Sequence, residues 1–343
     1  MELGIGMFGD LAFDVKTGKP ADAGVKLKEI LEEIKLADEV GLDVFGLGEH
    51  HRPDYAVSSP EIVLAAAAAV TNKIKLLSTV TVLSSAEPVK VYQDFATLDL
   101  ISGGRAEIGV GRGSFIESFP LFGYDLRDYD QLFEEKLDLL LKINNSEVVT
   151  WRGKLRAPLL QQSVYPRATN GGKLPIWVAV GGTPQSILRA ARLGLPLMLA
   201  IIGGLPRQFQ PLADYYKIEY EKNGHDVKQM QLGIHAHTFV SESPAEADAY
   251  FINYAAQMDR VGAERGWPPF TKNQYNSGRL KEGALFIGEP SAVVEKILYM
   301  HELFGITRFI AHMDVGAPNH SLMMKSIELF GTKVAPQIRA SLR

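Results

Sequence analysis

The sequence predicts an α/β fold, a single-domain (β/α)8 barrel that spans residues 1–343. Short apolar segments alternate with amphipathic helical segments, and about eight strand–helix units can be counted, which is the number that closes a barrel. Most of these strands are apolar on both faces, as is typical of a parallel sheet covered by helices. An open doubly wound sheet is the alternative, and the lack of a glycine-rich dinucleotide fingerprint after the first strand disfavours it.

The first part of the chain supplies four predicted strands and three helices. Clusters of apolar and β-branched residues predict strands at 3–8, 43–47, 74–83 and 106–110. Apolar residues at helical spacing, followed by a glycine stop, predict a helix at 27–41. A second helix should begin with Ser59 as N-cap and Pro60 in its first turn, and a third, at 89–104, ends in a glycine pair.

After Gly113 the regular alternation is interrupted. Residues 114–174 contain one clear helix, at 131–143, and a small hairpin around 148–154. The alternation resumes with strands at 175–180, 195–202, 231–240 and 308–315, and with a helix at 184–194. A second irregular segment, 262–283, contains several glycines and prolines. We therefore expect insertions at about 114–174 after the fourth strand and at 262–283 after the seventh.

Composition excludes several classes of function. The chain is 46% hydrophobic and 22% charged, its formal net charge is −4, and it has no dense block of basic residues, so a nucleic-acid partner is not expected. The absence of cysteine excludes disulfides, thiolate chemistry and cysteine-based zinc sites. Neither a secretory signal nor a membrane-length apolar stretch is visible, so we expect a cytoplasmic protein that does not bind membranes.

The segment GLGEHH places an acid and two imidazoles, Glu49, His50 and His51, directly after the second strand. Catalytic groups of barrels follow the carboxyl ends of the strands, so these residues should stand at the barrel mouth. Histidine titrates near neutral pH, which favours a catalytic role over the alternative of an ordinary polar loop.

The segment VGGTPQS, Val180 to Ser186, predicts a phosphate site. A strand ends at two glycines, Thr183 occupies an N-cap position, and Ser186 lies one turn into the helix. Backbone N–H groups, two hydroxyls and the positive end of the helix dipole would converge there. An ordinary capped helix is the alternative. Because no P-loop lysine is present, the phosphate would be held rather than transferred.

The segment EIGVGRG ends the fourth strand with Gly109, Gly111 and Gly113, and Arg112 lies between the last two of these glycines. Glycines at this position would admit a flat ligand close to the backbone. Arg112 could bind a phosphate or clamp a carboxylate of a neighbouring loop, and the residues do not decide between them. Together the three segments predict a flat, phosphorylated cofactor across the barrel mouth.

A metal-dependent barrel hydrolase is the rival hypothesis. His235 and His237 lie on one face of a predicted strand, and with His50, His51 and Asp314 they could form a zinc or iron site. Two imidazoles are only half of such a site. We therefore favour histidines that line the barrel interior, and expect no metal.

The segments GLGEHH, STVTVLSSAEPVKVYQDFATLDLISGGRAEIGVGRG and VAVGGTPQSILRAARLGLP resemble the bacterial luciferase-like flavin monooxygenases. The resemblance covers most of the chain and is strongest over 2–123 and 176–196. It implies a (β/α)8 barrel that takes reduced FMN from a separate NAD(P)H:flavin reductase and uses dioxygen on a small organic substrate. A deazaflavin-dependent dehydrogenase on the same scaffold and a non-catalytic flavin-binding protein are the alternatives.

The resemblance also implies roles for individual residues. His50 would be catalytic, and a cis peptide at Thr79–Val80 would lie behind the flavin ring. The phosphate and ribityl side would contact Arg112, Gly113, Ser114, Val180, Gly181, Gly182, Thr183 and Ser186, and the substrate pocket would include Phe8, Glu49, His51 and Phe115. The reactive cysteine of luciferase is replaced here by Gly111, so light emission from aldehydes is not expected.

The resemblance further implies a homodimer, built through the helix that follows Pro60 and the next helix, at 90–101. The first of these helices carries the segment LAAAAAV, whose small side chains allow close helix packing. Segment 262–283 is a candidate lid over the mouth because of its glycine and proline content. The sequence does not specify the substrate.

Overall fold

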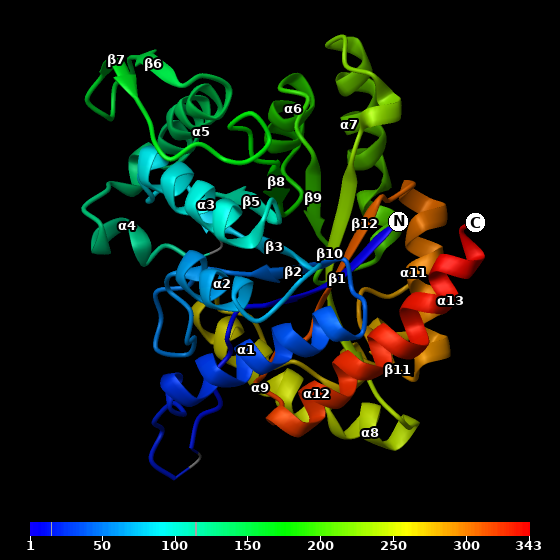
Figure 1. Ribbon diagram of the computed structural model, residues 1–343. Helices are drawn as coiled ribbons and strands as arrows, with labels where there is room; N and C mark the ends of the chain where they lie inside the picture. Colours follow the sequence, from blue (N-terminus) through cyan, green and yellow to red (C-terminus); the bar gives the residue numbers. More distant parts are fainter. Residues whose placement is uncertain (15, 114) are drawn as a thin grey trace.

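The computed structural model describes residues 1–14, 16–113 and 115–343. Eight parallel strands close into a barrel (Figure 1), because β12 pairs with β1 and β10 pairs with β9. In barrel order the strands are β1 (Glu2–Met7), β2 (Val44–Leu47), β3 (Lys75–Ser78), β5 (Ala106–Gly111), β8 (Ile176–Val180), β9 (Leu197–Ala200), β10 (Leu232–Val240) and β12 (Arg308–His312). The predicted (β/α)8 barrel is confirmed.

Helices surround the strands on the outside of the barrel (Figure 1). The main ones are α1 (Ala23–Glu39), α2 (Pro60–Ala68), α3 (Pro88–Ser102), α5 (Tyr129–Asn145), α6 (Pro184–Arg192), α7 (Gln210–Lys222), α11 (Pro290–Phe304) and α12 (His320–Leu329). The α1 helix begins one turn earlier than predicted, because the Asp22 carboxylate accepts the Val25 N–H at 3.0 Å and caps it. The α3 helix ends where predicted, at Gly103, whose φ of +70° is readily adopted by glycine.

The predicted third strand, 74–83, is interrupted. It divides into β3 and the two-residue β4 (Thr81–Val82), and the break is a cis peptide between Thr79 and Val80. The β4 strand pairs with β5 and stays at the carboxyl end of the barrel. The cis peptide that the family resemblance implied is therefore confirmed at the expected bond.

The insertion after β5 contains the predicted helix and hairpin. The helix is α5, and the hairpin pairs β6 (Val148–Trp151) with β7 (Leu159–Ser163) at the edge of the molecule (Figure 1). Between β5 and α5 lie α4 (Ser118–Leu121) and a short turn, η1 (Leu126–Asp128). This stretch passes over one side of the barrel mouth.

The insertion after β10 is more regular than predicted. It contains α8 (Pro244–Ala249), α9 (Phe251–Glu264), α10 (Lys272–Arg279) and β11 (Phe286–Gly288). The expectation of an irregular segment at 262–283 is therefore wrong in part, since Thr271 and Gln274 form a capping box that starts α10. Aromatic side chains such as Tyr254 and Tyr275 give this insertion a small hydrophobic core of its own.

A buried ionic network fills the amino-terminal end of the barrel. Arg308, which is 1% exposed, donates from Nη1 to Glu107 Oε2 at 2.5 Å and from Nε to Glu2 Oε2 at 2.7 Å. Trp177 Nε1 donates to the same Glu107 oxygen at 3.0 Å. Buried charges are stabilised only when paired and hydrogen-bonded in this way. The network closes this end, so the opposite end is left for a ligand.

The remaining short elements are η2 (Pro206–Phe209), η3 (Val227–Gln229), the π-helical η4 (Phe330–Val334) and α13 (Ala335–Ser341). Among the described residues, no helix has both the length and the apolar character needed to cross a bilayer.

Candidate active site

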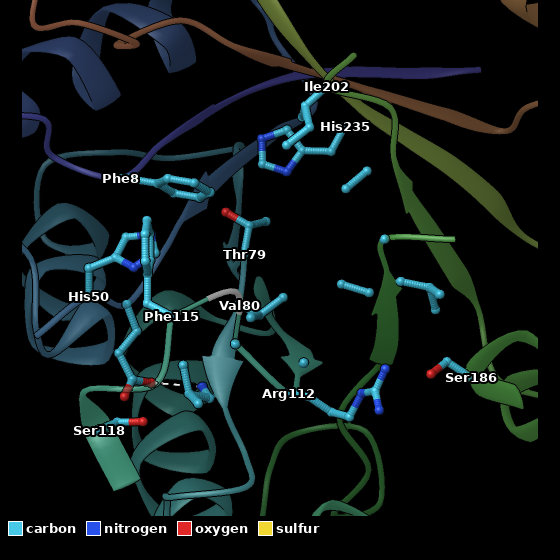
Figure 2. A pocket seen from close by; sticks show the side chains of 18 of the residues that line it. Phe8, His50, Thr79, Val80, Arg112, Phe115, Ser118, Ser186, Ile202 and His235 are labelled. Carbon is cyan, nitrogen blue, oxygen red and sulfur yellow. Dashed lines mark hydrogen bonds between the residues drawn. The ribbon is translucent and has the colours of Figure 1, made fainter. Parts of the chain in front are cut away.

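A cavity of about 470 Å3 opens at the carboxyl ends of the barrel strands (Figure 2). This is the end at which barrel enzymes carry their active sites, and the volume is typical of a small-molecule pocket. Most of the predicted site residues line it, namely Phe8, Glu49, His50, His51, Thr79, Val80, Arg112, Gly113, Phe115, Val180, Gly181, Thr183 and Ser186. Residues far apart in sequence are therefore brought into one site.

Two predicted residues fall outside this lining. Gly182 is not part of it as described; its φ of +115° instead turns the chain from β8 into α6. Ser114 lies outside the residues that the structure describes.

His50 is enclosed by aromatic rings at one side of the cavity. Its ring lies 4.7 Å from Phe8, 4.3 Å from Tyr55 and 5.2 Å from Phe115 between centroids. Burial lowers the pKa of His50 to about 3, and the positive charge of the Arg52 guanidinium acts in the same direction. His50 is therefore a neutral imidazole at physiological pH.

Glu49 connects the other imidazole of this loop to the neighbouring strand. Its Oε1 lies 2.7 Å from His51 Nε2, and its Oε2 accepts the Val82 N–H at 2.8 Å. The hydrogen bond that the Glu49 carboxylate accepts from His51 raises the pKa of His51. The two adjacent histidines thus have opposite properties: His50 is held neutral, whereas His51 is biased toward the charged form.

Polar side chains converge at the opposite side of the cavity, where β5 and β8 end (Figure 2). Arg112 Nη2 donates to Thr183 Oγ1 at 3.3 Å, and Thr183 Oγ1 donates to Ser186 Oγ at 2.9 Å. In the described part of the chain, the Thr183 side chain makes no capping bond to α6, so the helix start remains available. A guanidinium, two hydroxyls and a helix N-terminus together can bind an anion.

Arg112 also makes the carboxylate contact that the sequence left open. Its guanidinium pairs with Asp130 and lies over the Tyr129 ring, 5.1 Å from the centroid. The Asp130 side chain is 71% exposed, so solvent screens this pair. Arg112 can keep this contact and still reach the cavity.

The glycines of β5 have a different role from the one predicted. A Cβ on Gly109 would clash with the Ser78 carbonyl, and one on Gly111 would lie 2.7 Å from Val80 Cγ2. These glycines admit the neighbouring β3 strand and the Thr79–Val80 segment, rather than a ligand. The prediction of glycines that make room for a flat ligand is thus wrong for Gly109, and Gly111 lines the cavity behind Val80.

Sequence reasoning missed several lining residues. They are Val82, Glu117, Ser118, Tyr129, Ala179, Ala200, Ile202, Arg265 and His312. Of these, His312 carried a usable signal. It lies in the predicted strand 308–315, two residues before Asp314, and side chains on one face of a strand repeat every two residues.

The histidines of β10 line the barrel interior, as favoured over a metal site. His235 Nε2 lies 3.0 Å from His312 Nδ1, and His237 Nδ1 lies 2.8 Å from the Tyr254 hydroxyl. Asp10, His312 and Asp314 bring potential ligand atoms within 4.8 Å of one another. The Asp314 carboxylate already accepts three backbone N–H groups, however, so its lone pairs are in use.

Three buried polar atoms at the cavity find no partner among the described residues. They are His50 Nε2, Thr79 Oγ1 and Ser118 Oγ, and all three residues line the cavity. Buried polar atoms are hydrogen-bonded in the great majority of cases, and exceptions in a cavity indicate a missing ligand or water. The cavity therefore suits a ligand with polar atoms at its edge.

Comparison with known proteins assigns the chain to a family. The family model described as luciferase-like monooxygenase matches residues 1–307. The chain belongs to this family, and its membership indicates an oxidoreductase.

Relatives with known names are distant but cover most of the chain. Limonene 1,2-monooxygenase of Rhodococcus erythropolis is 26% identical over 94% of this chain and 84% of its own length. 4-Hydroxyprotoasukamycin monooxygenase of Streptomyces nodosus subsp. asukaensis is 26% identical over 94% of this chain and 89% of its own.

Solved structures share the fold. Monooxygenase RslO1 of Streptomyces bottropensis superposes with a TM-score of 0.85 at 23% identity, covering 98% of this chain and 99% of its own. The oxygenating constituent of 3,6-diketocamphane monooxygenase from Pseudomonas putida, in complex with FMN, has a TM-score of 0.75 at 20% identity over 98% of both chains. A coenzyme F420-dependent tetrahydromethanopterin reductase of Methanopyrus kandleri has a TM-score of 0.70 at 19% identity, covering 98% of this chain and all of its own.

Proposed function

We propose that this protein binds reduced FMN and uses it with dioxygen to oxygenate a small organic substrate. The observation that carries the proposal is the pairing of two features in one cavity. Unpartnered polar atoms of His50, Thr79 and Ser118 lie on its wall, and Arg112 and Ser186 converge at its other side (Figure 2). A flat ligand with a charged tail has this distribution of polar groups.

The residues present fit FMN at both ends. Arg112, Thr183, Ser186 and the start of α6 would hold the phosphate, since they supply charged and neutral donors to one point. Apolar side chains such as Val80 and Ile202 provide walls against which a flat ring can pack. When bound, reduced FMN supplies the electrons for the activation of dioxygen.

His50 is the proposed catalytic residue. Because its pKa is lowered to about 3, its ring carries one N–H and one lone pair at neutral pH. Its Nε2 is buried without a partner in the described chain, so it is free to donate or accept one hydrogen bond to a ligand. Phe8 and Phe115 lie against the ring and exclude water from it.

The resemblance of the fold to an FMN complex and to an F420-dependent enzyme leaves one competing function, a deazaflavin-dependent dehydrogenase. Titration of the purified protein with FMN and with F420, followed by flavin fluorescence, tests the choice. We expect FMN to bind and F420 to bind more weakly. Tight binding of F420 with no binding of FMN would overturn the proposal.

A second measurement tests catalysis. With a separate flavin reductase, NADH and FMN, the protein should alter dioxygen uptake when a candidate substrate is added. Binding of FMN without any such effect, across a panel of substrates, would support a non-catalytic flavin-binding protein instead.

We also propose the partners that follow from this function: a transient flavin reductase and a second copy of the chain. The α2 and α3 helices pack side by side and leave Ile62, Leu100 and Ile101 exposed, as is Val70 in the turn after α2. Apolar side chains gathered on adjacent helices indicate a protein contact. Light scattering of the purified protein should give twice the monomer mass.

A further inference from the structure

Asp314, His312 and His235 form a hydrogen-bonded row in the cavity wall. His312 Nε2 lies 3.2 Å from Asp314 Oδ1, and His312 Nδ1 lies 3.0 Å from His235 Nε2. The two imidazoles come from neighbouring strands, β12 and β10, and stack with centroids 4.9 Å apart. All three side chains are buried, and both histidines line the cavity.

The far end of the row is an ionised carboxylate. Asp314 accepts the backbone N–H groups of Phe8, Gly9 and Asp10 at 2.7 to 3.2 Å. Burial raises the pKa of Asp314, but the hydrogen bond from His312 and these N–H groups outweigh it and bring the pKa to about 2. The neighbouring Asp10 behaves in the opposite way, because burial and the charge of Asp314 raise its pKa. Of the two carboxyl groups, Asp314 carries the charge.

The Asp314 charge orders the protons in a row in which each imidazole carries a single hydrogen. A carboxylate only accepts, so His312 Nε2 must donate to it, and the other nitrogen of a neutral ring, Nδ1, must accept. His235 Nε2 is then the donor to His312 Nδ1. The remaining nitrogen, His235 Nδ1, keeps a lone pair.

The lone pair of His235 is available to a ligand. Both ring nitrogens of His312 have partners, whereas His235 Nδ1 has no hydrogen bond to any described residue. The barrel makes room for this ring, since a Cβ on Gly6 would lie 2.9 Å from His235 Nε2. A buried imidazole with a purely structural role would use both nitrogens.

We propose that His235 is a further catalytic residue, the base that accepts a proton from a weakly acidic hydroxyl of the substrate, and that His312 and Asp314 are positioning residues behind it. The inference deepens the proposed function and rests on it for the reaction that follows. His50 keeps its own role on the other side of Phe8, whose ring lies 4.7 Å from His50 and 6.0 Å from His235.

The proton transfer balances within the row. The substrate O–H bond breaks, its electron pair stays on oxygen, and the proton binds His235 Nδ1. The His235 Nε2–H bond breaks as a new N–H bond forms at His312 Nδ1. His235 is neutral again, and the positive charge rests on His312 beside the Asp314 carboxylate, where it is best stabilised.

The chemistry indicates the class of substrate. Because burial lowers the pKa of His235, the row can accept a proton only from an acidic hydroxyl, such as a phenol with a pKa near 10 or an enol, and only if the positive charge passes on to His312 beside Asp314. An ordinary alcohol is too weak an acid for this transfer. The ring of Phe8 meets His312 edge-on at 4.2 Å and offers an aromatic surface at the same place. We therefore infer a flat substrate with a phenolic or enolic hydroxyl.

Nuclear magnetic resonance of the protein without cofactor tests the proton positions. In protein labelled with ¹⁵N-histidine, two-bond correlations distinguish ring nitrogens with and without hydrogen for each of the 8 histidines. We expect N–H at Nε2 and a bare Nδ1 for both His235 and His312 at neutral pH. His312→Gln keeps an amide donor to Asp314 but breaks the row, so the His235 signals should change.

The matched control is His237→Gln, which lines the same cavity but hydrogen-bonds Tyr254 instead. It removes a ring whose centroid lies 5.4 Å from that of His312, so small shifts are expected, but it should leave the pattern of protonated and bare nitrogens in His235 and His312 unchanged. The proposal would be overturned if His235 Nδ1 carried a hydrogen, or if the His235 signals were the same in wild type and in His312→Gln. Because no flavin is present, this outcome is separate from failure of the proposed function.

Binding of 4-nitrophenol, whose anion absorbs visible light, tests the base directly. At a pH about one unit below the pKa of the free probe, the ratio of ionised to protonated nitrophenol should be about tenfold higher for the bound probe than for the free probe. His235→Asn should abolish this increase, and His312→Gln should reduce it, whereas His237→Gln should retain it. Equal ionisation in wild type and His235→Asn overturns the role of the base, and failure to bind overturns the substrate class.

Discussion

Replacing Arg112 with alanine tests where the phosphate of FMN binds. Arg112 Nη2 lies 3.3 Å from Thr183 Oγ1, and Thr183 in turn donates to Ser186, so a phosphate at this point would accept from all three. A hydrogen bond to a charged group contributes about 1.5–3 kcal/mol. Because Arg112 is 24% exposed and loses an exposed pair with Asp130, the lower half of this range applies.

The expected loss of affinity follows from this value. About 1.4 kcal/mol corresponds to a factor of ten in the dissociation constant, so Arg112→Ala should weaken FMN binding about tenfold to fortyfold. Ser186→Ala removes a hydrogen bond from an uncharged donor to the charged phosphate, at the lower limit of the same range, about 1.5 kcal/mol, and should weaken FMN binding about tenfold. Fluorescence titration of the flavin measures both constants.

Riboflavin, which lacks the phosphate, separates this effect from general damage. Arg112→Ala and Ser186→Ala should leave riboflavin affinity within about twofold of wild type. The charge-matched control is Arg192→Ala, which removes an arginine from the last turn of the same helix, α6, outside the cavity. If Arg112→Ala weakened FMN and riboflavin equally, or weakened neither, the phosphate would not lie at the start of α6.

Three further predictions concern turnover, stability and assembly. His50→Gln should lower flavin-dependent turnover about a hundredfold or more and should change the dissociation constant of FMN by no more than about threefold. Loss of FMN binding would show instead that His50 has a structural role. Between pH 6.5 and 5 the free energy of unfolding should fall by about 2 kcal/mol for each of His50 and His237. In this pH range the imidazoles take up a proton in the unfolded chain but stay neutral in the folded chain, where their pKa values are near 3. Urea unfolding of His237→Gln should lose one of these contributions, and an unchanged slope would contradict the assignment. Ile101→Glu should convert a dimer to a monomer in light scattering, whereas Ile252→Glu, at a still more exposed site on α9, should not.

The barrel itself could be predicted because its signals are local. Each strand is a short apolar run that ends in a polar loop, and each helix has its own apolar stripe and stop signals. The positions of Thr183 and Ser186 at the start of α6 followed from the same local rules. The capping box of Thr271 and Gln274 was also visible, and reading it would have predicted α10.

The histidine row could not be predicted in the same way, because it depends on pairing between distant segments. His312 meets His235 only through the register of β12 against β10, in which His312 pairs with His237 and Ile310 with His235. The N–H groups that keep Asp314 ionised come from residues 8–10, about 300 positions earlier in the chain. Strand order and register are tertiary facts, and neither is encoded in a single segment.

The prediction for the glycines of β5 failed because the partner of each glycine was wrongly identified. Their small size was correctly noticed, but the neighbour that requires it is Ser78 of β3 for Gly109 and Val80 for Gly111. A glycine in a strand indicates a close approach without saying whether the approaching group is a ligand or another part of the chain. Only the three-dimensional arrangement distinguishes these cases.

The buried imidazoles lower the stability of the protein in mild acid, and this loss indicates that the cavity has a function. His50, His235 and His237 are all held neutral by burial, and each takes up a proton on unfolding in mild acid, so the chain loses stability there. Apolar side chains of similar size would fill the same wall without that loss. The barrel instead places imidazoles on β10, β12 and the loop after β2, opposite the polar side chains of β5 and α6 (Figure 2). The proposed oxygenation would use one side of this cavity to bind a phosphate and the other to exchange protons, and the two sets of side chains stand on the sides that this division needs.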